Sequence, residues 1–321
     1  MRFKRVLVIC AGGAESGGPE ALHHLVGQLI RLGQDAYISY FPYGVLTSTP
    51  TSYLRLGVEV VQFSDSEGDL IIFPEVMTSE ARKIKNATPA IWWLSKDHFY
   101  LRNGDNKLRD WIRYCKAVAR GTRPLGGVKT LKHMKHFAQS HYVKSHLERH
   151  LGLEIPLLME PINEEFLRYQ GEETSRQNTV LFNPAKGFHY VKQLIRIAPS
   201  INFQPLSGKS RDELKRIFLT SKVYIDFGHH PGRDRIPREA ASQGCIVICR
   251  SVGSAENQLD VPIPAKYKIK SDYPQWAELT VQLIESIFLD FDVHFKIFEP
   301  YRLQIKDEPI NFKEHILKII S

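Results

Sequence analysis

The sequence is poor in cysteine and lacks any long run of apolar residues. Its four cysteines, Cys10, Cys115, Cys245 and Cys249, have no metal-binding spacing. Since three of them lie in strand-like apolar runs, we expect buried free thiols in a reducing compartment. No run approaches the roughly 18 apolar residues of a membrane-spanning helix, and the apolar run before Gly12 is too short for a signal peptide. These absences favour a cytoplasmic protein, with the inner membrane surface as a further location.

Motifs for metal ions and nucleic acids are also missing. The 13 histidines show no HExxH or similar spacing. Asp290-Phe291-Asp292 ends a helical pattern instead of following a central strand, so we expect no metal site. The formal net charge is +8, yet the chain has no arginine-rich tail, zinc-finger spacing or RNP-like motif. The positive charge therefore favours phosphorylated small molecules or an anionic lipid surface over nucleic acid.

Residues 223–248, VYIDFGHHPGRDRIPREAASQGCIVI, predict a strand, a glycine-rich loop, a helix and a second strand. The first residues are β-branched and aromatic, which is typical of a buried strand. Pro237 fits a first helical turn, and Gly244 fits the end of that helix. A βα loop so rich in polar residues favours a functional role, because such loops usually carry function. The alternative is a surface loop with solvated arginines.

The chemistry of this loop predicts an anionic ligand. A glycine-rich turn exposes backbone N–H groups, and a helix N-terminus adds a partial positive charge. Arginine adds forked donors that suit phosphate oxygens. Glu239 is either an ion-pair partner of the arginines or an acceptor for a ribose hydroxyl. The phosphate-binding candidates are Gly228, Gly232, Arg233, Arg235 and Arg238.

This stretch resembles the nucleotide-sugar site of GT-B glycosyltransferases, in particular the family-4-like enzymes. A glutamate in the corresponding helix of those enzymes holds the donor ribose, and Glu239 matches it. Their E-x7-E pattern has an earlier glutamate where this chain has Pro231. The resemblance implies transfer of a sugar from a nucleotide-diphosphate sugar to a hydroxyl. The missing glutamate leaves the donor sugar and the stereochemical outcome open.

Lys186 and Gly187 follow a predicted strand at residues 179–183 and look like the phosphate-binding lysine loop of such a donor domain. With Arg233 and Arg235, Lys186 would neutralise the diphosphate as it leaves, which is where negative charge develops. The two histidines of the arginine loop, His229 and His230, are candidates for donating to the leaving phosphate. No cofactor or metal is expected.

The N-terminal half predicts a second set of loops at strand ends. A strand at residues 5–10 precedes the loop AGGAESGG, which either lets an acceptor approach the backbone or is an ordinary βα turn. Its glycines do not fit the G-x-G-x-x-G dinucleotide fingerprint. These acceptor-side candidates are Gly12, Gly13, Gly17 and Gly18.

Acidic and imidazole side chains follow two further strands of this half. Glu75 follows a predicted strand at residues 69–73, and Asp97 and His98 follow another at residues 90–94. α/β proteins place ligands at strand ends, and these residue types serve as general bases. Asp97 is the first candidate base if the enzyme inverts. The alternative is that these residues cap helices and turns.

The order of these patterns predicts an α/β protein with two Rossmann-like domains facing a cleft. Residues 1–168 form the acceptor-side domain, 169–178 the hinge, and 179–294 the nucleotide-sugar domain. Residues 295–321 form a C-terminal segment whose last helix crosses back to the first domain. Residues 101–130 are basic with interleaved aromatics, and they form either an amphipathic or mobile segment near the acceptor or a solvated helix and loop.

We therefore predict a metal-independent glycosyltransferase of bacterial surface polysaccharide or glycan synthesis. Its partners would be a nucleotide sugar and a glycan or lipid-linked acceptor, with peripheral membrane association and without nucleic acid. Two alternatives stay open. One is a non-catalytic nucleotide- or glycan-binding module of a polysaccharide assembly, because the first glutamate of the pair is missing. The other is a nucleotide-sugar epimerase of similar fold.

Overall fold

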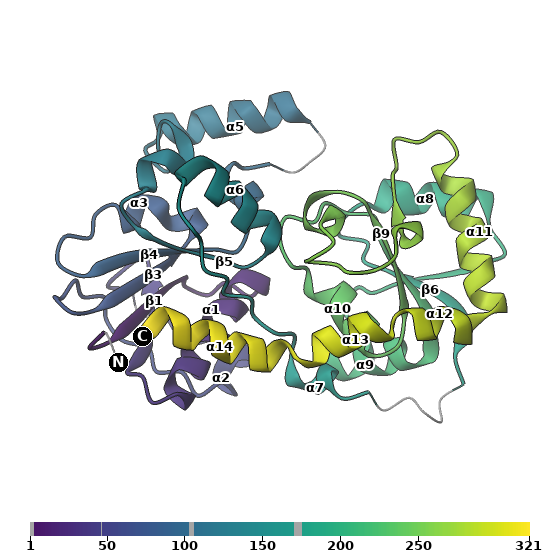
Figure 1. Ribbon diagram of the computed structural model, residues 1–321, viewed down its shortest axis with the longest axis horizontal. Coiled ribbons are helices and arrows are strands. Elements are labelled where there is room, and N and C mark those ends of the chain that lie inside the picture. Colours follow the sequence, from purple (N-terminus) through teal and green to yellow (C-terminus); the bar gives the residue numbers. More distant parts are fainter. Residues whose placement is uncertain (1–2, 46, 103–105, 170–174) are drawn as a thin grey trace. The chain divides into compact units, whose positions relative to one another are not determined.

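The computed structural model describes residues 3–45, 47–102, 106–169 and 175–321. It divides into two compact α/β units (Figure 1). The first unit contains Met1–Glu160 and Pro309–Ser321, and the second contains Pro161–Glu308. No helix of the described ranges is both long and apolar enough to cross a membrane.

The first unit is built on a five-stranded parallel sheet in the order β2-β1-β3-β4-β5. Two of its inner strands, β1 and β3, are apolar along their whole length and almost entirely buried, as expected of a parallel sheet covered by helices. The strands are β1 (Val6–Ala11), β2 (Ala36–Phe41), β3 (Leu70–Pro74), β4 (Thr88–Trp93) and β5 (Lys135–Ala138). The helices are α1 (Gly17–Arg31), α2 (Thr51–Leu54), η1 (Glu75–Met77), α3 (Thr78–Ala81), α4 (Lys96–Phe99), α5 (Lys107–Ala119), η2 (Gly127–Leu131) and α6 (His141–Leu151).

The last helix of the chain, α14 (Glu308–Ile320), belongs to the first unit from Pro309 onward. Its apolar side chains share one core cluster with β1 and α1, which confirms the predicted return of the C-terminal helix to the first domain. The residues that α14 contributes to this core are Phe312, Ile316, Ile319 and Ile320.

The second unit has a parallel sheet in the order β10-β9-β8-β6-β7. Its strands are β6 (Gln177–Phe182), β7 (Asn202–Pro205), β8 (Ser221–Asp226), β9 (Ile246–Arg250) and β10 (Lys268–Ile269). Its helices are α7 (Glu164–Leu167), α8 (Phe188–Ile197), α9 (Arg211–Thr220), α10 (Arg235–Ser242), η3 (Gly253–Glu256), η4 (Ala265–Tyr267), α11 (Trp276–Leu289), α12 (Phe291–Ile297) and α13 (Glu299–Lys306).

Both sheets have the same topology. In each, the second strand along the chain lies at an edge, and the direction of winding reverses between the first and third strands. These are β1 and β3 in the first unit, and β6 and β8 in the second. Ligands of open α/β sheets bind outside the carboxyl ends of the strands at this switch point. The prediction of two Rossmann-like domains is confirmed, and the topology marks one ligand-binding edge in each.

The limits of some segments differ from those expected. The units divide between Glu160 and Pro161, before the hinge predicted at 169–178, and residues 170–174 of that hinge lie outside the described residues. The C-terminal segment predicted at 295–321 is shared, because its residues up to Glu308 belong to the second unit. Residues 58–63 form only a single bridge, between Val60 and Ile38, beside the edge strand β2.

Candidate functional site

The loops after β6 and β8 touch at the switch point of the second unit. A Cβ atom on Gly187 would lie only 2.4 Å from the carbonyl carbon of Phe227, and Gly187 has a φ of +68°. A Cβ atom on Gly228 would lie 2.5 Å from Cδ of Lys186. Gly187 therefore requires glycine, because a side chain there would push the two backbones apart, and a side chain at Gly228 would displace that of Lys186. The predicted lysine loop and arginine loop form one structure.

Lys186 lies between two carboxylates supplied by the second of these loops. Its Nζ is 2.8 Å from Oδ2 of Asp234 and 3.3 Å from Oδ2 of Asp226, the last residue of β8. Tyr224 donates a hydrogen bond of 3.2 Å to the same Asp226 oxygen. Burial acts to lower the pKa of Lys186, but Asp234 and Asp226 outweigh it and hold that pKa above its ordinary value. Lys186 is therefore a permanent cation.

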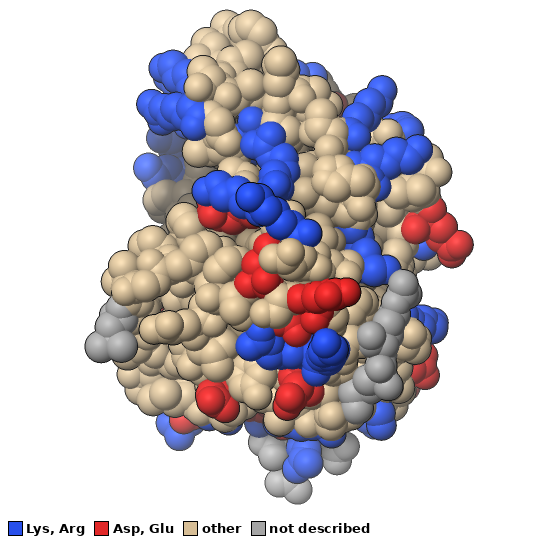
Figure 2. Space-filling model, turned by 90° about the vertical axis from the view of Figure 1, so that its left-hand side faces the viewer, with Lys and Arg blue, Asp and Glu red and all other residues tan. Residues whose placement is uncertain are grey.

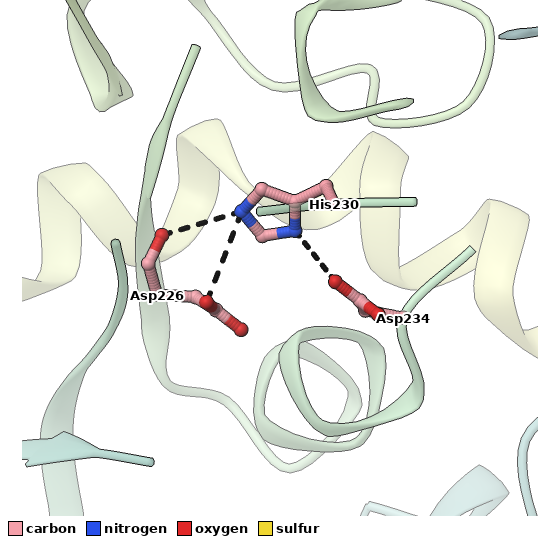
Figure 3. A group of neighbouring side chains, drawn as sticks. All are labelled: Asp226, His230 and Asp234. Carbon is pink, nitrogen blue, oxygen red and sulfur yellow. Dashed lines mark hydrogen bonds and ion pairs between the residues drawn. The ribbon is translucent and has the colours of Figure 1, made fainter. Parts of the chain in front are cut away.

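His230 contacts both Asp226 and Asp234 (Figure 3). Its Nδ1 is 2.7 Å from Oδ2 of Asp234, and its Nε2 is 3.3 Å from the carbonyl oxygen of Asp226. Burial acts to raise the pKa of Asp234, but Lys186 and His230 hold it well below its ordinary range. We call Lys186, Asp226, His230 and Asp234 the Lys186 network. In it, two carboxylates contact one ammonium group and one imidazole.

The same cluster is the one group of the described residues whose side chains could together ligate a metal ion. One ligand atom each from Asp226, His230 and Asp234 lie within 4.8 Å of one another. The ammonium of Lys186 already contacts both carboxylates, and Nδ1 of His230 already contacts Asp234. A divalent ion would have to displace both contacts. The donor set fits an internal cation better than a metal ion.

Two of the three predicted phosphate-binding arginines lie inside the second unit. Arg233 Nη2 is 2.6 Å from Oε1 of Glu308, and Arg238 Nη1 is 2.6 Å from Oε2 of Glu308. The side chains of Arg238 and Glu308 are only 2% and 3% exposed. The backbone N–H of Ile162 also donates to Glu308. This differs from the expected location at an open loop, because Glu308 draws both guanidinium groups into the core.

The other residues predicted for this loop remain near its surface or in α10. Arg235 begins α10 and is partly exposed, as is His229 in the loop before it. Glu239 lies in α10 and is 6% exposed. Gly232 is buried, and its carbonyl oxygen accepts a hydrogen bond from Ser254.

Glu75 lies at the switch point of the first unit, directly after β3. It is 2% exposed, and its Oε2 accepts a hydrogen bond of 3.0 Å from the backbone N–H of Leu94 after β4. Burial raises the pKa of Glu75 to about 7. Its Oε1 is 3.8 Å from Nδ1 of His98, whose side chain is 59% exposed. A carboxyl group that titrates near neutrality beside an accessible imidazole suits proton transfer.

Asp97 is adjacent in sequence to His98 but is buried. Its Oδ2 accepts a hydrogen bond of 3.0 Å from Oη of Tyr142 in α6. The Nζ atom of Lys96 lies 3.6 Å from the centre of the same ring. These contacts join α4 to α6 around Asp97.

The predicted glycine loop follows β1 at the same edge of the sheet as Glu75. Gly12 donates from its backbone to Phe41 at the end of β2, and Gly13 is exposed with a φ of +68°. Gly17 and Gly18 lie in the first turn of α1. The sheet thus brings the acceptor-side glycines and Glu75 to one edge.

Sequence reasoning missed three acidic residues of these sites. Asp226 and Asp234 lie within residues 223–248, and no function was predicted for them, although a polar residue that ends an apolar strand, as Asp226 does, is a usable signal. Glu308 gave no signal, because nothing near it in the sequence indicates that two arginines bind it.

No protein-family model matches the sequence, and a comparison with curated proteins finds no match. Solved structures are similar over the whole chain. A glycosyltransferase from Rickettsia africae ESF-5 has a TM-score of 0.61 and 13% identity, covering 98% of this chain and 99% of that one. Sucrose-phosphate synthase from Thermosynechococcus elongatus has a TM-score of 0.68 and 11% identity, covering 98% and 97%. The catalytic domain of starch synthase IV from Arabidopsis thaliana, bound to ADP and acarbose, has a TM-score of 0.55 and 12% identity, covering 99% and 100%. The chain therefore has the predicted GT-B fold.

Proposed function

We propose that the protein is a glycosyltransferase that moves a sugar from a nucleotide-diphosphate sugar to a hydroxyl group. The observation that carries this proposal is the likeness of the whole chain, through both Rossmann-like units, to GT-B transferases. It is supported by polar residues at both switch points, where ligands of such sheets bind. The fitting acceptors are a glycan or a lipid-linked glycan of surface polysaccharide synthesis in the cytoplasm.

The donor diphosphate is assigned to the touching loops of the second unit. Arg235 and His229 are the partly exposed donors of the arginine loop there. Lys186 is already held by Asp226 and Asp234, and it joins the lysine loop to the arginine loop. Arg233 and Arg238 hold the loop in place through Glu308. Glu239 is assigned to the ribose, as the resemblance implies. Fixed positive charge near the diphosphate would favour its departure.

A binding experiment separates the contact of Arg235 with the diphosphate from the contact of Glu239 with the ribose. Arg235→Ala should weaken binding of a nucleoside diphosphate by about 1.5–3 kcal/mol, the cost of losing a charge-assisted hydrogen bond. It should change nucleoside binding far less. Glu239→Gln should have the opposite pattern, because a neutral amide is a weaker acceptor for the ribose hydroxyl than a carboxylate, while the loss of one negative charge does not weaken diphosphate binding. Isothermal titration with a matched diphosphate and nucleoside measures both.

Arg216→Ala is the matched control, since Arg216 is exposed on α9. It should leave both affinities unchanged. Equal losses for the two ligands in Arg235→Ala and in Glu239→Gln would mean that the loop is structural, and the assignment would fall.

Proton transfer is assigned to the first unit. His98 is accessible to an acceptor and Glu75 is not, so His98 would take the proton of the acceptor hydroxyl while Glu75 stabilises the imidazolium. The acceptor oxygen then bonds to the anomeric carbon. The bond between that carbon and the diphosphate oxygen breaks, and its electron pair leaves with the nucleoside diphosphate. A base on the acceptor side implies single displacement with inversion, which NMR of the product's anomeric carbon would check.

We propose that the reaction needs no metal ion, because Lys186 already occupies the cation position between Asp226 and Asp234. Activity should therefore be unchanged, within about twofold, after dialysis against EDTA. The measurement is the initial rate before and after dialysis, with manganese or magnesium added back. Complete loss that either ion restores would contradict this and would return attention to Asp226, His230 and Asp234.

The donor can be identified by a thermal-shift screen against a panel of nucleotide sugars. A ligand that binds only the folded state stabilises it by about 2.7 kcal/mol at one hundred times its Kd. The right donor should stand out from other nucleotides by the rise in melting temperature. A flat panel would contradict the proposed donor site.

A further inference from the structure

The helix α5 of the first unit presents apolar side chains to solvent. Leu108 is 66% exposed and Trp111 is 64% exposed, and Ile112 is exposed beside them. Cys115 is also exposed. These positions are spaced i, i+3, i+4 and i+7, so they form one continuous stripe along the helix. An exposed apolar stripe of this kind marks an interaction surface.

The opposite side of α5 attaches it to the unit. Asp110 and Ala117 are buried, and Tyr114 donates a hydrogen bond of 2.9 Å to the carbonyl oxygen of Pro124. The Tyr114 ring also lies 5.5 Å from the ring of Tyr100. Because the helix already packs through this side, its apolar stripe is not needed for the core.

Exposed cations flank the stripe. The one acidic side chain of α5, Asp110, faces inward and lies 3.6 Å from Arg113. Figure 2 shows that Lys and Arg predominate over Asp and Glu in the upper part of the face that it displays. The exposed cations of α5 and its C-cap are Lys107, Arg109, Arg113, Lys116 and Arg120.

We propose that α5 docks on an anionic membrane surface. A helix with a cationic border and a stripe of Leu, Trp and Ile lies in the plane of a lipid interface. The cations would contact lipid phosphates, each worth about a fivefold change in binding. The apolar stripe would enter the boundary between headgroups and acyl chains. Surface docking of this kind needs no spanning helix and no sugar transfer, so it stands apart from the proposed activity.

Trp111 reports on this docking directly. Its fluorescence should shift to the blue when it enters the lipid interface, because the indole then leaves water. The other tryptophans are already buried, so the shift can be assigned to Trp111. The full chain is mixed with vesicles of phosphatidylcholine and phosphatidylglycerol, and with vesicles of phosphatidylcholine alone. The anionic vesicles should bind at least tenfold more tightly, and binding should fall with added salt. The buried tryptophans are Trp92, Trp93 and Trp276.

Two pairs of substitutions separate the contribution of the α5 cations to membrane binding from that of the apolar stripe. Arg109→Gln with Lys116→Gln should weaken binding to anionic vesicles about 25-fold, at about fivefold for each cation. Leu108→Ser with Ile112→Ser should weaken it at least tenfold and reduce the blue shift. All four residues are exposed, so circular dichroism should give unchanged melting temperatures. The controls Leu289→Ser and Lys313→Gln remove an exposed leucine and an exposed lysine elsewhere and should bind normally.

The membrane proposal is overturned if the native chain ignores anionic vesicles, or binds neutral ones equally well. It is also overturned if both α5 pairs bind normally, since the surface would then lie elsewhere. Concentration-dependent self-association that the Leu108→Ser and Ile112→Ser pair abolishes, without vesicle binding, would assign the stripe to a second copy and likewise overturn it. Tight anionic binding lost in both pairs and retained in both controls supports it.

Discussion

Glu308→Ala is expected to destabilise the second unit by about 3–5 kcal/mol, the usual cost of breaking a buried ion pair by removing one partner. Glu308 is the shared carboxylate of Arg233 and Arg238, and both guanidinium groups would keep their charge in the core. Hydrogen exchange of the peptide containing β8 should show the loss as reduced protection. Exchange of β1 in the first unit is the internal reference.

Glu314→Ala is the matched control, because Glu314 lies on the same helix and is exposed. It should change stability by less than about 0.5 kcal/mol. Glu308→Gln should have an intermediate effect, since the amide oxygen still accepts hydrogen bonds but the charge is lost. A loss below about 1 kcal/mol for Glu308→Ala would contradict this, because it would mean that other groups satisfy the two arginines.

His98→Gln is expected to lower kcat by about 10²–10⁴-fold, the usual contribution of a general base. The imidazole is the accessible member of the Glu75–His98 pair, and glutamine cannot take a proton. His133→Gln, at an exposed histidine of the same unit, should leave kcat unchanged. Steady-state kinetics with saturating donor measure both variants.

The pH dependence tests the partner of His98. The raised pKa of about 7 means that Glu75 is neutral below that pH and ionised above it. Only the ionised form stabilises an imidazolium, so kcat should rise with pH through about 7 and then level off. Glu75→Gln should lower kcat and remove this rise. If Asp97→Asn abolishes activity while His98→Gln keeps it, the base is Asp97.

The strands and the positions of the loops could be predicted because each depends on local sequence. The apolar run that became β8 and the glycine after it are read directly from neighbouring residues. The glycines of the two loops could also be recognised from the sequence, and Gly187 and Gly228 do lie where the loops approach each other closely. Local patterns thus fixed which loops carry the candidate donor site.

The charge partners within those loops could not be predicted, because they depend on strand order. Lys186 meets Asp226 and Asp234 only because β6 and β8 are neighbours while β7 lies at the edge. Arg233 and Arg238 bind Glu308 across about 70 positions of sequence. A sequence shows that arginines are present in a loop, but not whether a distant carboxylate has already neutralised them.

The most direct test of the account is product analysis after incubation with the donor found by the screen and a panel of glycan and lipid-linked acceptors. The account predicts a new glycoside of inverted anomeric configuration and one equivalent of nucleoside diphosphate, with His98→Gln nearly inactive. An epimerised donor without any glycoside, or tight donor binding with no turnover under any acceptor, would contradict it.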